Sequence, residues 1–304
     1  MAISRHQLVK ELEPGLNALF GLEYNRYDNQ HAEIYTSENS DRAFEEEVML
    51  SGFGNASVKN EGSGVAFDNA QESFSARYTH ETMALAFAIT EEAIEDNLYD
   101  KISSRYTKAL ARSMSNAKQV KAVAPLNNGL PSVDGFDSGD GVSLFNTSHT
   151  TVSGTSVKNT LTTQADLNET SLEQAMIDIA GMTDERGLRI AAKAVKMIVP
   201  SANQFAAERL MKSQGRTGTA DNDINALGSM GMIPQGYRVN NFLTDTDSFY
   251  IITDVPNGMK MFTRAPLTTA MEGDFDTGNV RYKARERYSF GVSDYRGIFG
   301  VEGA

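Results

Sequence analysis

The sequence predicts an α+β protein in which helices and strands are partly segregated along the chain. The first observation behind this prediction is one long helical stretch that is free of glycine and proline. The second is a glycine-rich segment before it with few residues that could form a core. The third is a run of short strands and turns after residue 235. Together they favour an extended, shell-building architecture over a compact enzyme.

The long helical stretch covers residues 91–124. Its apolar side chains recur every three or four positions, which is the spacing of one helix face. Thr90 is a natural N-cap, and acidic residues after it and Lys118 and Lys121 at the far end suit the helix dipole. Pro125 is expected to end this helix, which would be about 50 Å long. The apolar stripe consists of Ile94, Leu98, Ile102, Tyr106, Leu110, Met114 and Ala117.

The first 50 residues form an acidic segment, with ten Asp and Glu against four Lys and Arg. Leu16, Leu19 and Phe20 predict one short amphipathic helical turn, and residues 41–50 predict a second. The segment is either a mobile terminus or an arm that lies on a neighbouring subunit. The residues alone leave both interpretations open.

A glycine-rich stretch follows at residues 51–80. Alternating apolar residues at 65–67 and 74–78 predict the two strands of a hairpin that is mostly exposed. Because an isolated two-stranded hairpin is only marginally stable in water, it would need another subunit to lie on. The alternative is a loose surface loop.

The rest of the chain alternates shorter elements. A clean apolar alternation predicts a strand over residues 82–89, and residues 127–165 are loop-rich. Ser171 and Ser201 each precede a glutamine by three positions, which predicts a capped helix start at both, with Phe205 facing inward in the second helix. Strands are predicted at 194–199, 237–243, 249–253, 259–264 and 279–292, with a turn at 256–258.

Composition excludes several classes of protein. The 304 residues, with 40% hydrophobic and 22% charged content, are typical of a globular chain that can bury a core. With no cysteine, the chain has no disulfide framework and no thiol nucleophile. No apolar run is long enough to span a membrane, and the first residues do not resemble a signal peptide. The net charge of −12 argues against a protein that reads DNA or RNA by neutralising phosphates.

The sequence offers little for catalysis, cofactors or metals, and we expect none of them. His6, His31, His80 and His149 have no metal-binding spacing, and no phosphate-binding or nucleophile motif occurs. Acidic clusters at 134–140 and 221–225 suit either Asp-rich turns or a weak cation site.

One tripeptide, Asp276-Thr277-Gly278, matches the aspartic-protease motif. A hydrolase of that class needs two carboxylates that share one proton, and only one copy of the motif is present here. A hydrolase that uses Asp276 therefore remains a weak alternative to a structural protein.

A row of four cations alternates along the last predicted strand: Arg281, Lys283, Arg285 and Arg287. In an extended strand all four lie on one face. This face is either simply solvated or a docking surface for an acidic neighbour. The candidate neighbours are the 1–50 segment and the run Glu45, Glu46 and Glu47.

The order of these segments resembles the major capsid proteins of tailed bacteriophages, which have the Hong Kong 97-type fold. The resemblance lies in FEEEVMLSGFG before the hairpin and in LAFAITEEAIEDNLYDKISSRYTKALARSM for the spine helix. DGVSLFNTSHT, SLEQAMIDIAGMTDERG and KMIVPSANQFAAERLMKS are similar to the central lobe, and VRYKARERYSFGVSDYRGIFG to the closing strands. It covers nearly the whole chain.

The resemblance implies five regions and a function. The regions are an N-terminal arm (1–47), an E-loop (48–81), a peripheral domain with the spine helix (82–126), a mostly axial domain (127–270) and closing strands of the peripheral domain (271–304). It implies pentamers and hexamers that close into an icosahedral shell around double-stranded DNA. Scaffolding, portal and possible decoration proteins are implied partners, and the virion, assembled in the bacterial host cytoplasm, is the implied location.

Two further points follow from the resemblance. Some members of the family cross-link through an E-loop lysine; Lys59 lies in that segment, but we do not predict the bond. The segment before the hairpin is too short for an internal scaffold, so a separate scaffolding protein is expected. An encapsulin-type nanocompartment, which has a similar fold but encloses a cargo enzyme, remains the nearest alternative.

Overall fold

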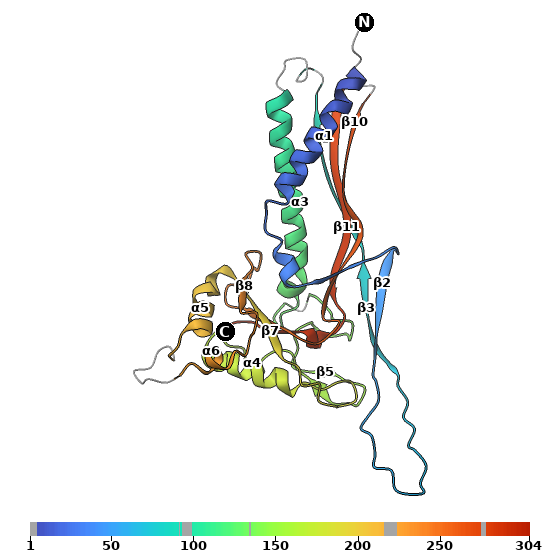
Figure 1. Ribbon diagram of the computed structural model, residues 1–304, viewed down its shortest axis with the longest axis vertical. Helices are drawn as coiled ribbons and strands as arrows, with labels where there is room; N and C mark the ends of the chain where they lie inside the picture. The colour runs from blue at the N-terminus through green and yellow to red at the C-terminus, as the bar shows by residue number, and fades with distance from the viewer. Residues whose placement is uncertain (1–4, 91, 93–98, 134, 216–223, 275–277) are drawn as a thin grey trace.

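The computed structural model describes residues 5–90, 92, 99–133, 135–215, 224–274 and 278–304. Figure 1 shows three parts: an elongated part with two helices and long strands, a lobe at lower left that contains the C-terminus, and a hairpin that projects at lower right. In the described residues no helix is long and apolar enough to cross a membrane.

A four-stranded sheet, here called the peripheral sheet, runs along the elongated part. Its order is β1 (Thr36–Asn39), β10 (Met259–Gly273), β11 (Val280–Val292) and β4 (Glu81–Ile89). β1 is parallel to β10, and the other pairs are antiparallel. The strand predicted at 82–89 is confirmed.

The prediction that the strand at 259 ends at residue 264 is wrong. β10 continues to Gly273 past Pro266, because two register shifts between Thr263 and Thr268 absorb the residue that cannot donate to the ladder.

Two helices cover one face of this sheet: α1 (Arg5–Tyr24) and α3 (Tyr99–Asn128). Leu16 and Phe20 of α1 meet Leu110 and Met114 of α3 over the sheet residues Tyr282 and Ala284. The short turn predicted around Leu16 is therefore part of a 20-residue helix. It is longer than predicted because tertiary packing, not propensity, supplies most helix stability.

The prediction that Pro125 ends the long helix is wrong. Pro125 lies inside α3, which continues to Asn128. The following Leu126 is completely buried in the main core, and this packing outweighs the hydrogen bond that proline removes near the helix end. Of the predicted stripe, Leu110 and Met114 are buried, whereas Tyr106 is 53% exposed. Ile94 and Leu98 lie outside the described residues.

The projecting hairpin pairs β2 (Phe44–Leu50) with β3 (Glu72–Thr79). The helical turn predicted at 41–50 is wrong, because every second side chain of β2 is half-buried, which is the period of a strand. The strand predicted at 65–67 is also wrong for the single chain, since those residues have no strand partner.

The lobe is built on a second sheet, in the order β12 (Ile298–Val301), β9 (Phe249–Thr253), β7 (Ala194–Val199) and β8 (Tyr237–Val239). The strands at 194–199 and 249–253 match the prediction. The other lobe elements are α4 (Glu169–Gly181), α5 (Gln204–Lys212), α6 (Ala226–Met230), β5 (His149–Thr150) and β6 (Ser156–Val157). Short 3-10 turns occur at Gln30–Glu33, Ser201–Asn203 and Tyr295–Gly297.

Three details of the lobe helices differ from the sequence prediction. Asn168, not Ser171, caps α4: its Oδ1 accepts the Ser171 N–H, and the Ser171 hydroxyl accepts the Asn168 N–H in return. Ser201 begins a 3-10 turn, and α5 starts at Gln204 without a side-chain cap. Phe205 is 68% exposed rather than inward-facing.

Sheet membership divides the chain differently from the expected ranges 127–270 and 271–304. β10 begins at Met259 yet belongs to the peripheral sheet, and β12, after residue 297, pairs with β9 in the lobe. The two parts are therefore interlaced by the last strands of the chain.

Candidate assembly surfaces

The face of the peripheral sheet opposite α1 and α3 carries the predicted row of cations. Side chains alternate along β11, so Tyr282 and Ala284 enter the core and the cations point the other way. We call this side the basic face; its cations are Arg281, Lys283, Arg285 and Arg287.

Small residues flank the basic face. On β4, Ala86 is in register with Lys283, and Ala84 with Arg285. On β10, Ala270 and Thr268 take the corresponding positions. The long cationic side chains therefore stand above two rows of short side chains, which gives a flat surface open to a partner.

The four cations differ in their surroundings. Arg281 forms an ion pair with Asp274 of its own chain. Arg287 is half-buried, and no described residue forms a hydrogen bond with its Nε. Lys283 and Arg285 are exposed, and no carboxylate of a described residue forms an ion pair with them. Among the described residues, the middle of the row is thus the part without a counter-charge.

The acidic run of β2 lies at the root of the hairpin and contacts its own chain. Glu45 accepts a hydrogen bond of 2.6 Å from the Ser40 hydroxyl. Glu46 lies 3.8 Å from Arg77 on the paired strand, an exposed and weak pair. Glu47 lies 2.5 Å from the buried Lys260 amine. The structure therefore does not place this run on the basic face of the same chain.

His80 is the single residue between β3 and β4, and it links the hairpin root to the peripheral sheet. Its Nε2 lies 2.9 Å from the Ser40 Oγ, and its Nδ1 lies 2.9 Å from the Ser289 Oγ. Because the Ser40 hydroxyl already donates to Glu45, it must accept from Nε2–H. In the neutral imidazole, which its lowered pKa favours, Nδ1 then accepts the Ser289 proton.

The surroundings of His80 oppose its protonation. Burial and the nearby Arg287 lower the pKa of this imidazole, and Arg264 acts in the same direction against the opposite effect of Glu45. A charge on His80 would therefore weaken the link between hairpin and sheet.

Tyr78 of β3 also fixes the root of the hairpin. Its ring is 2% exposed and packs edge-on against Phe262, with ring centroids 4.8 Å apart. Its hydroxyl lies 2.5 Å from the Ser293 hydroxyl. A Cβ at Gly291 would come within 2.6 Å of the Tyr78 ring, so glycine is required there to admit it.

The hairpin is also attached to the lobe. Ser73 of β3 donates a 3.0 Å hydrogen bond to Glu185, which pairs at 2.6 Å with the buried Arg296. In the outer part of the hairpin, the Arg186 guanidinium lies 2.7 Å from the Asp68 carboxylate. Next to Arg296 lies the carboxyl group of Asp294. Burial raises the pKa of this carboxyl, and the positive charge of Arg296 opposes that rise. These contacts orient the hairpin relative to both sheets.

Apart from these contacts, the outer part of the hairpin forms few hydrogen bonds. We call residues 51–71 the tip; they form no strand, and their backbone bonds to each other are confined to Ser51–Gln71 and Ser63–Asn60. Lys59 is exposed here. The tip also exposes apolar side chains, namely Phe53 (62%), Val58 (91%), Val65 (67%) and Phe67 (98%).

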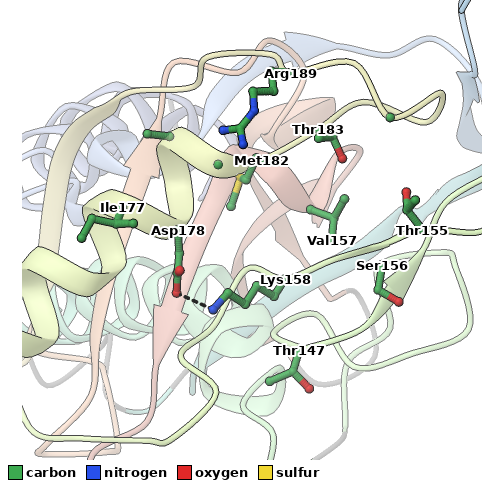
Figure 2. A pocket seen from close by; sticks show the side chains of 13 residues that line it. Thr147, Thr155, Ser156, Val157, Lys158, Ile177, Asp178, Met182, Thr183 and Arg189 are labelled. Atoms are coloured by element: carbon green, nitrogen blue, oxygen red, sulfur yellow. Dashed lines mark ion pairs between the residues drawn. The ribbon is translucent and has the colours of Figure 1, made fainter.

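The lobe contains a shallow recess of about 790 Å³ between α4 and the β5–β6 region. Figure 2 shows the ion pair of Lys158 and Asp178 on one side and Arg189 above Met182 on the other. The Lys158 amine lies 2.8 Å from the Asp178 carboxylate. Hydroxyl side chains of threonine and serine line much of the remainder. No nucleophile–base pair of the kind used in catalysis is formed by the residues that line it.

The described part of the first acidic cluster forms a turn. Asp137 accepts the backbone N–H groups of Gly139 and Gly141, and the Asp140 carboxylate lies 2.6 Å from His149 Nδ1. Across the described part of the chain no group of three His, Cys, Asp or Glu side chains is arranged to hold a metal. Asp134, Asp221, Asp223 and Asp276 lie outside the described residues.

Three of the four histidines are buried and bonded, which the sequence did not indicate. His31 contacts Gln119, and burial together with Lys118 lowers its pKa to about 4. His149 stacks on Tyr295 with ring centroids 3.9 Å apart. His80 forms the hairpin link. In the sequence, the only sign of this role is that His80 lies between two predicted strands. None of its hydrogen-bond partners is close to it in sequence.

Comparison with known proteins identifies the architecture. A family model described as phage capsid protein matches residues 73–301. A search of curated proteins by sequence found no match.

Among solved structures, the capsid of Myoviridae phage XM1 is similar at a TM-score of 0.55 and 12% identity, over 89% of each chain. The procapsid of bacteriophage JBD30 is similar at 0.54 and 13%, over 99% of this chain and 77% of that one. The virus-like particle from Pyrococcus furiosus is similar at 0.51 and 10%, over 94% and 98%. At these identities the likeness shows the fold, which is the Hong Kong 97-type α+β fold.

Proposed function

The chain belongs to the phage capsid protein family and is a major capsid protein, and we propose that its copies form pentamers and hexamers that close into an icosahedral shell around double-stranded DNA. The observation that carries this proposal is the tip of the hairpin. It exposes four large apolar side chains that the chain itself does not cover. Large apolar side chains that a chain leaves uncovered in one segment favour an interface there.

The basic face is a second surface that lacks a partner within the described chain. Lys283 and Arg285 stand on an open sheet face without a carboxylate partner among the described residues. Like charges in a row repel unless something negative lies opposite them. We therefore propose that this face, with Arg281 and Arg287 at its ends, contacts an acidic surface of a neighbouring subunit.

The acidic run contributes unequally to such contacts. The side chain of Glu46 is 48% exposed and holds Arg77 only loosely. Glu45 and Glu47 are more enclosed by Ser40 and Lys260. Of the three glutamates, Glu46 is therefore the one most available for contact with a neighbouring subunit. Lys59 at the tip is exposed as well. We propose a non-covalent contact at Lys59.

The remaining partners follow from the family. We propose that separate scaffolding and portal proteins, and possibly a decoration protein, act with this chain, and that shells assemble in the bacterial host cytoplasm and end in the virion. We also propose that the chain has no enzymatic activity. The net charge of −12 supports a container that encloses DNA without sequence-specific binding.

Electron microscopy of the purified protein, alone and co-expressed with the neighbouring genes, tests the proposal. Closed shells or rings of five and six subunits are expected. A monodisperse monomer in both cases would contradict it. Shells that carry a cargo enzyme instead of DNA would support the nanocompartment alternative.

The double reversal Lys283→Glu and Arg285→Glu tests the basic face. Particle yield should fall most strongly at low salt, where charge interactions are least screened. The matched control is Lys193→Glu with Arg209→Glu, which changes net charge equally at exposed positions of the lobe. Equal yields for the two double variants at every salt concentration would show that the basic face is only solvated.

A further inference from the structure

A bulge in β10 brings two arginines together at one end of the basic face. In the register between β10 and β11, Thr263 pairs with Tyr288 and Ala265 pairs with Arg287, so Arg264 is an extra residue. In a bulge, two residues of one strand oppose a single residue of its partner. Arg264 and Ala265 therefore both lie opposite Arg287.

Both arginines also lie close to His80. The positive charges of Arg287 and Arg264 each lower the pKa of this imidazole, an effect that requires charges nearby. The His80 ring contacts the Ser289 hydroxyl, and Ser289 is two residues beyond Arg287 on β11. The two guanidinium groups therefore gather at the root of the hairpin.

Neither arginine has a counter-charge within the described part of the chain. No described carboxylate forms an ion pair with Arg264 or Arg287, and the Nε of each is buried without a hydrogen-bond acceptor. Both residues are half-buried. Burying an unpaired charge is unfavourable, and arginine does not avoid this cost by losing its proton. The pair therefore favours an anion that comes from outside these residues.

The carboxylate whose charge acts on His80 is that of Glu45, and it is already engaged. Its Oε1 accepts the Ser40 hydroxyl, and its Oε2 lies 3.8 Å from the Arg42 guanidinium. Because Glu45 and Arg42 balance each other, the two positive charges of Arg264 and Arg287 remain uncompensated.

A divalent oxyanion matches these two charges. The guanidinium group presents its N–H donors in a planar fork that fits the oxygens of phosphate and similar anions. Two such forks can hold one tetrahedral dianion between them, whereas a single carboxylate supplies one negative charge. Since both Nε atoms are buried, the terminal amino groups are the donors that the anion would meet.

We propose that Arg264 and Arg287 form a binding site for a small divalent oxyanion of the phosphate and sulfate class. The site lies within one subunit, so it goes beyond the proposed function and does not depend on assembly. Lys283 and Arg285 remain available to a neighbouring subunit. The net charge of −12 favours a free ion over a phosphate carried on nucleic acid, because the chain as a whole repels a polyanion.

Equilibrium dialysis of the purified full chain against radiolabelled sulfate measures this site, in the unassembled chain and in particles. We expect saturable binding. Arg264→Gln should weaken it by about tenfold or more, since hydrogen bonds to charged groups are among the strongest. Arg264→Lys keeps the charge but loses the fork, and should weaken binding less. The matched control is Arg209→Gln, at an exposed position of the lobe, which should leave binding unchanged.

Selective labelling of arginine with phenylglyoxal gives a measurement that needs no substitution. Peptide mass spectrometry reports the labelling rates of Arg264 and Arg287 in sulfate and in chloride of equal ionic strength. At a sulfate concentration ten times its Kd, labelling of both should slow by about tenfold, which is the fall in the unoccupied fraction. The labelling rate of Arg209 should stay the same.

Three results would overturn the proposal. Sulfate binding of equal strength in wild type and Arg264→Gln, with no slowing of labelling, would show only general attraction to the surface. Displacement of sulfate by a duplex oligonucleotide at lower phosphate concentration than free phosphate requires would place the anion on nucleic acid. If neither the unassembled chain nor particles bind sulfate, the free-ion site is excluded. A lower particle yield for Arg264→Gln would then assign the pair to a carboxylate of a neighbouring subunit.

Discussion

The two ends of the hairpin differ sharply in what holds them. The root, where β2 and β3 leave the peripheral sheet, is fixed by the buried Tyr78 ring, by the His80 link and by Lys260 between two glutamates. The tip has apolar side chains up to 98% exposed and few backbone bonds. The chain thus sets the direction of the hairpin by itself and leaves its end to be completed by another subunit.

This division has a physical basis. A root held by buried packing and hydrogen bonds loses little further entropy when subunits meet, because its orientation is already fixed. A tip with free backbone groups can adapt to the surface it meets. Substitutions at the root should therefore affect the unassembled chain, and substitutions at the tip should affect assembly.

The largest effect on the unassembled chain is expected for Tyr78→Ala. It empties the space beside Phe262 and removes the hydrogen bond to Ser293. Truncation of a buried aromatic residue typically costs about 3–5 kcal/mol of unfolding free energy. Chemical denaturation of the unassembled chain measures this loss. Phe67→Ala is the matched control, and a loss of similar size there would contradict the distinction between root and tip.

A smaller loss is expected for Lys260→Met. The amine is buried, and its pKa is raised because hydrogen bonds to Glu47 and Glu38 outweigh the opposing effect of burial. Removing it leaves two carboxylates without a counter-charge, but both are partly exposed, so we expect about 2 kcal/mol. The same denaturation experiment measures it. Lys59→Met at the tip should change the free energy by less than about 0.5 kcal/mol.

Acid should weaken the root through His80. Its pKa in the folded chain is below the ordinary value of about 6.5 because of burial and Arg287. As pH falls below about 6.5 the unfolded chain takes up the proton first, so this part of the stability is present above that pH and lost below it.

His80→Gln tests this origin of the pH dependence. A glutamine amide can donate to Ser40 and accept from Ser289, as the neutral imidazole does, but it does not titrate. The unfolding free energy of the variant should therefore fall less between pH 7 and pH 5 than that of the wild type. Identical pH profiles would show that His80 stays neutral in both states or that other groups dominate.

The smallest effect on the unassembled chain is expected for Phe67→Ser. The side chain contacts almost nothing, so the unfolding free energy should change by less than about 0.5 kcal/mol. Particle yield, measured by sedimentation, should nevertheless fall, because the serine loses the apolar area that a neighbour would cover. Unchanged particle yield would show that Phe67 is not part of an interface.

Much of the fold could be predicted from local patterns. The strands at 82–89, 194–199 and 249–253 follow the alternation of apolar residues, and the cation row lies on one face because strand side chains alternate. These features depend only on the nearest neighbours in sequence. The order of segments was enough to indicate the capsid fold.

The sequence predictions were wrong where contacts between residues far apart in the sequence determine the local structure. Pro125 does not end α3, because the next residue, Leu126, packs in the main core against residues that are far away in the sequence. Residues 41–50 form a strand because they pair with β3 some 30 residues later. The His80 network joins three separate segments. No local pattern contains that information.

The structure of an assembled particle by electron cryo-microscopy would show directly whether another subunit completes the tip. We expect Tyr78 and His80 to keep the contacts described above within their own subunit, and residues 51–71 to lie against a neighbouring subunit with Phe67 covered. A particle in which the tip remains free of every neighbour, or in which the root has left its own peripheral sheet, would contradict this expectation.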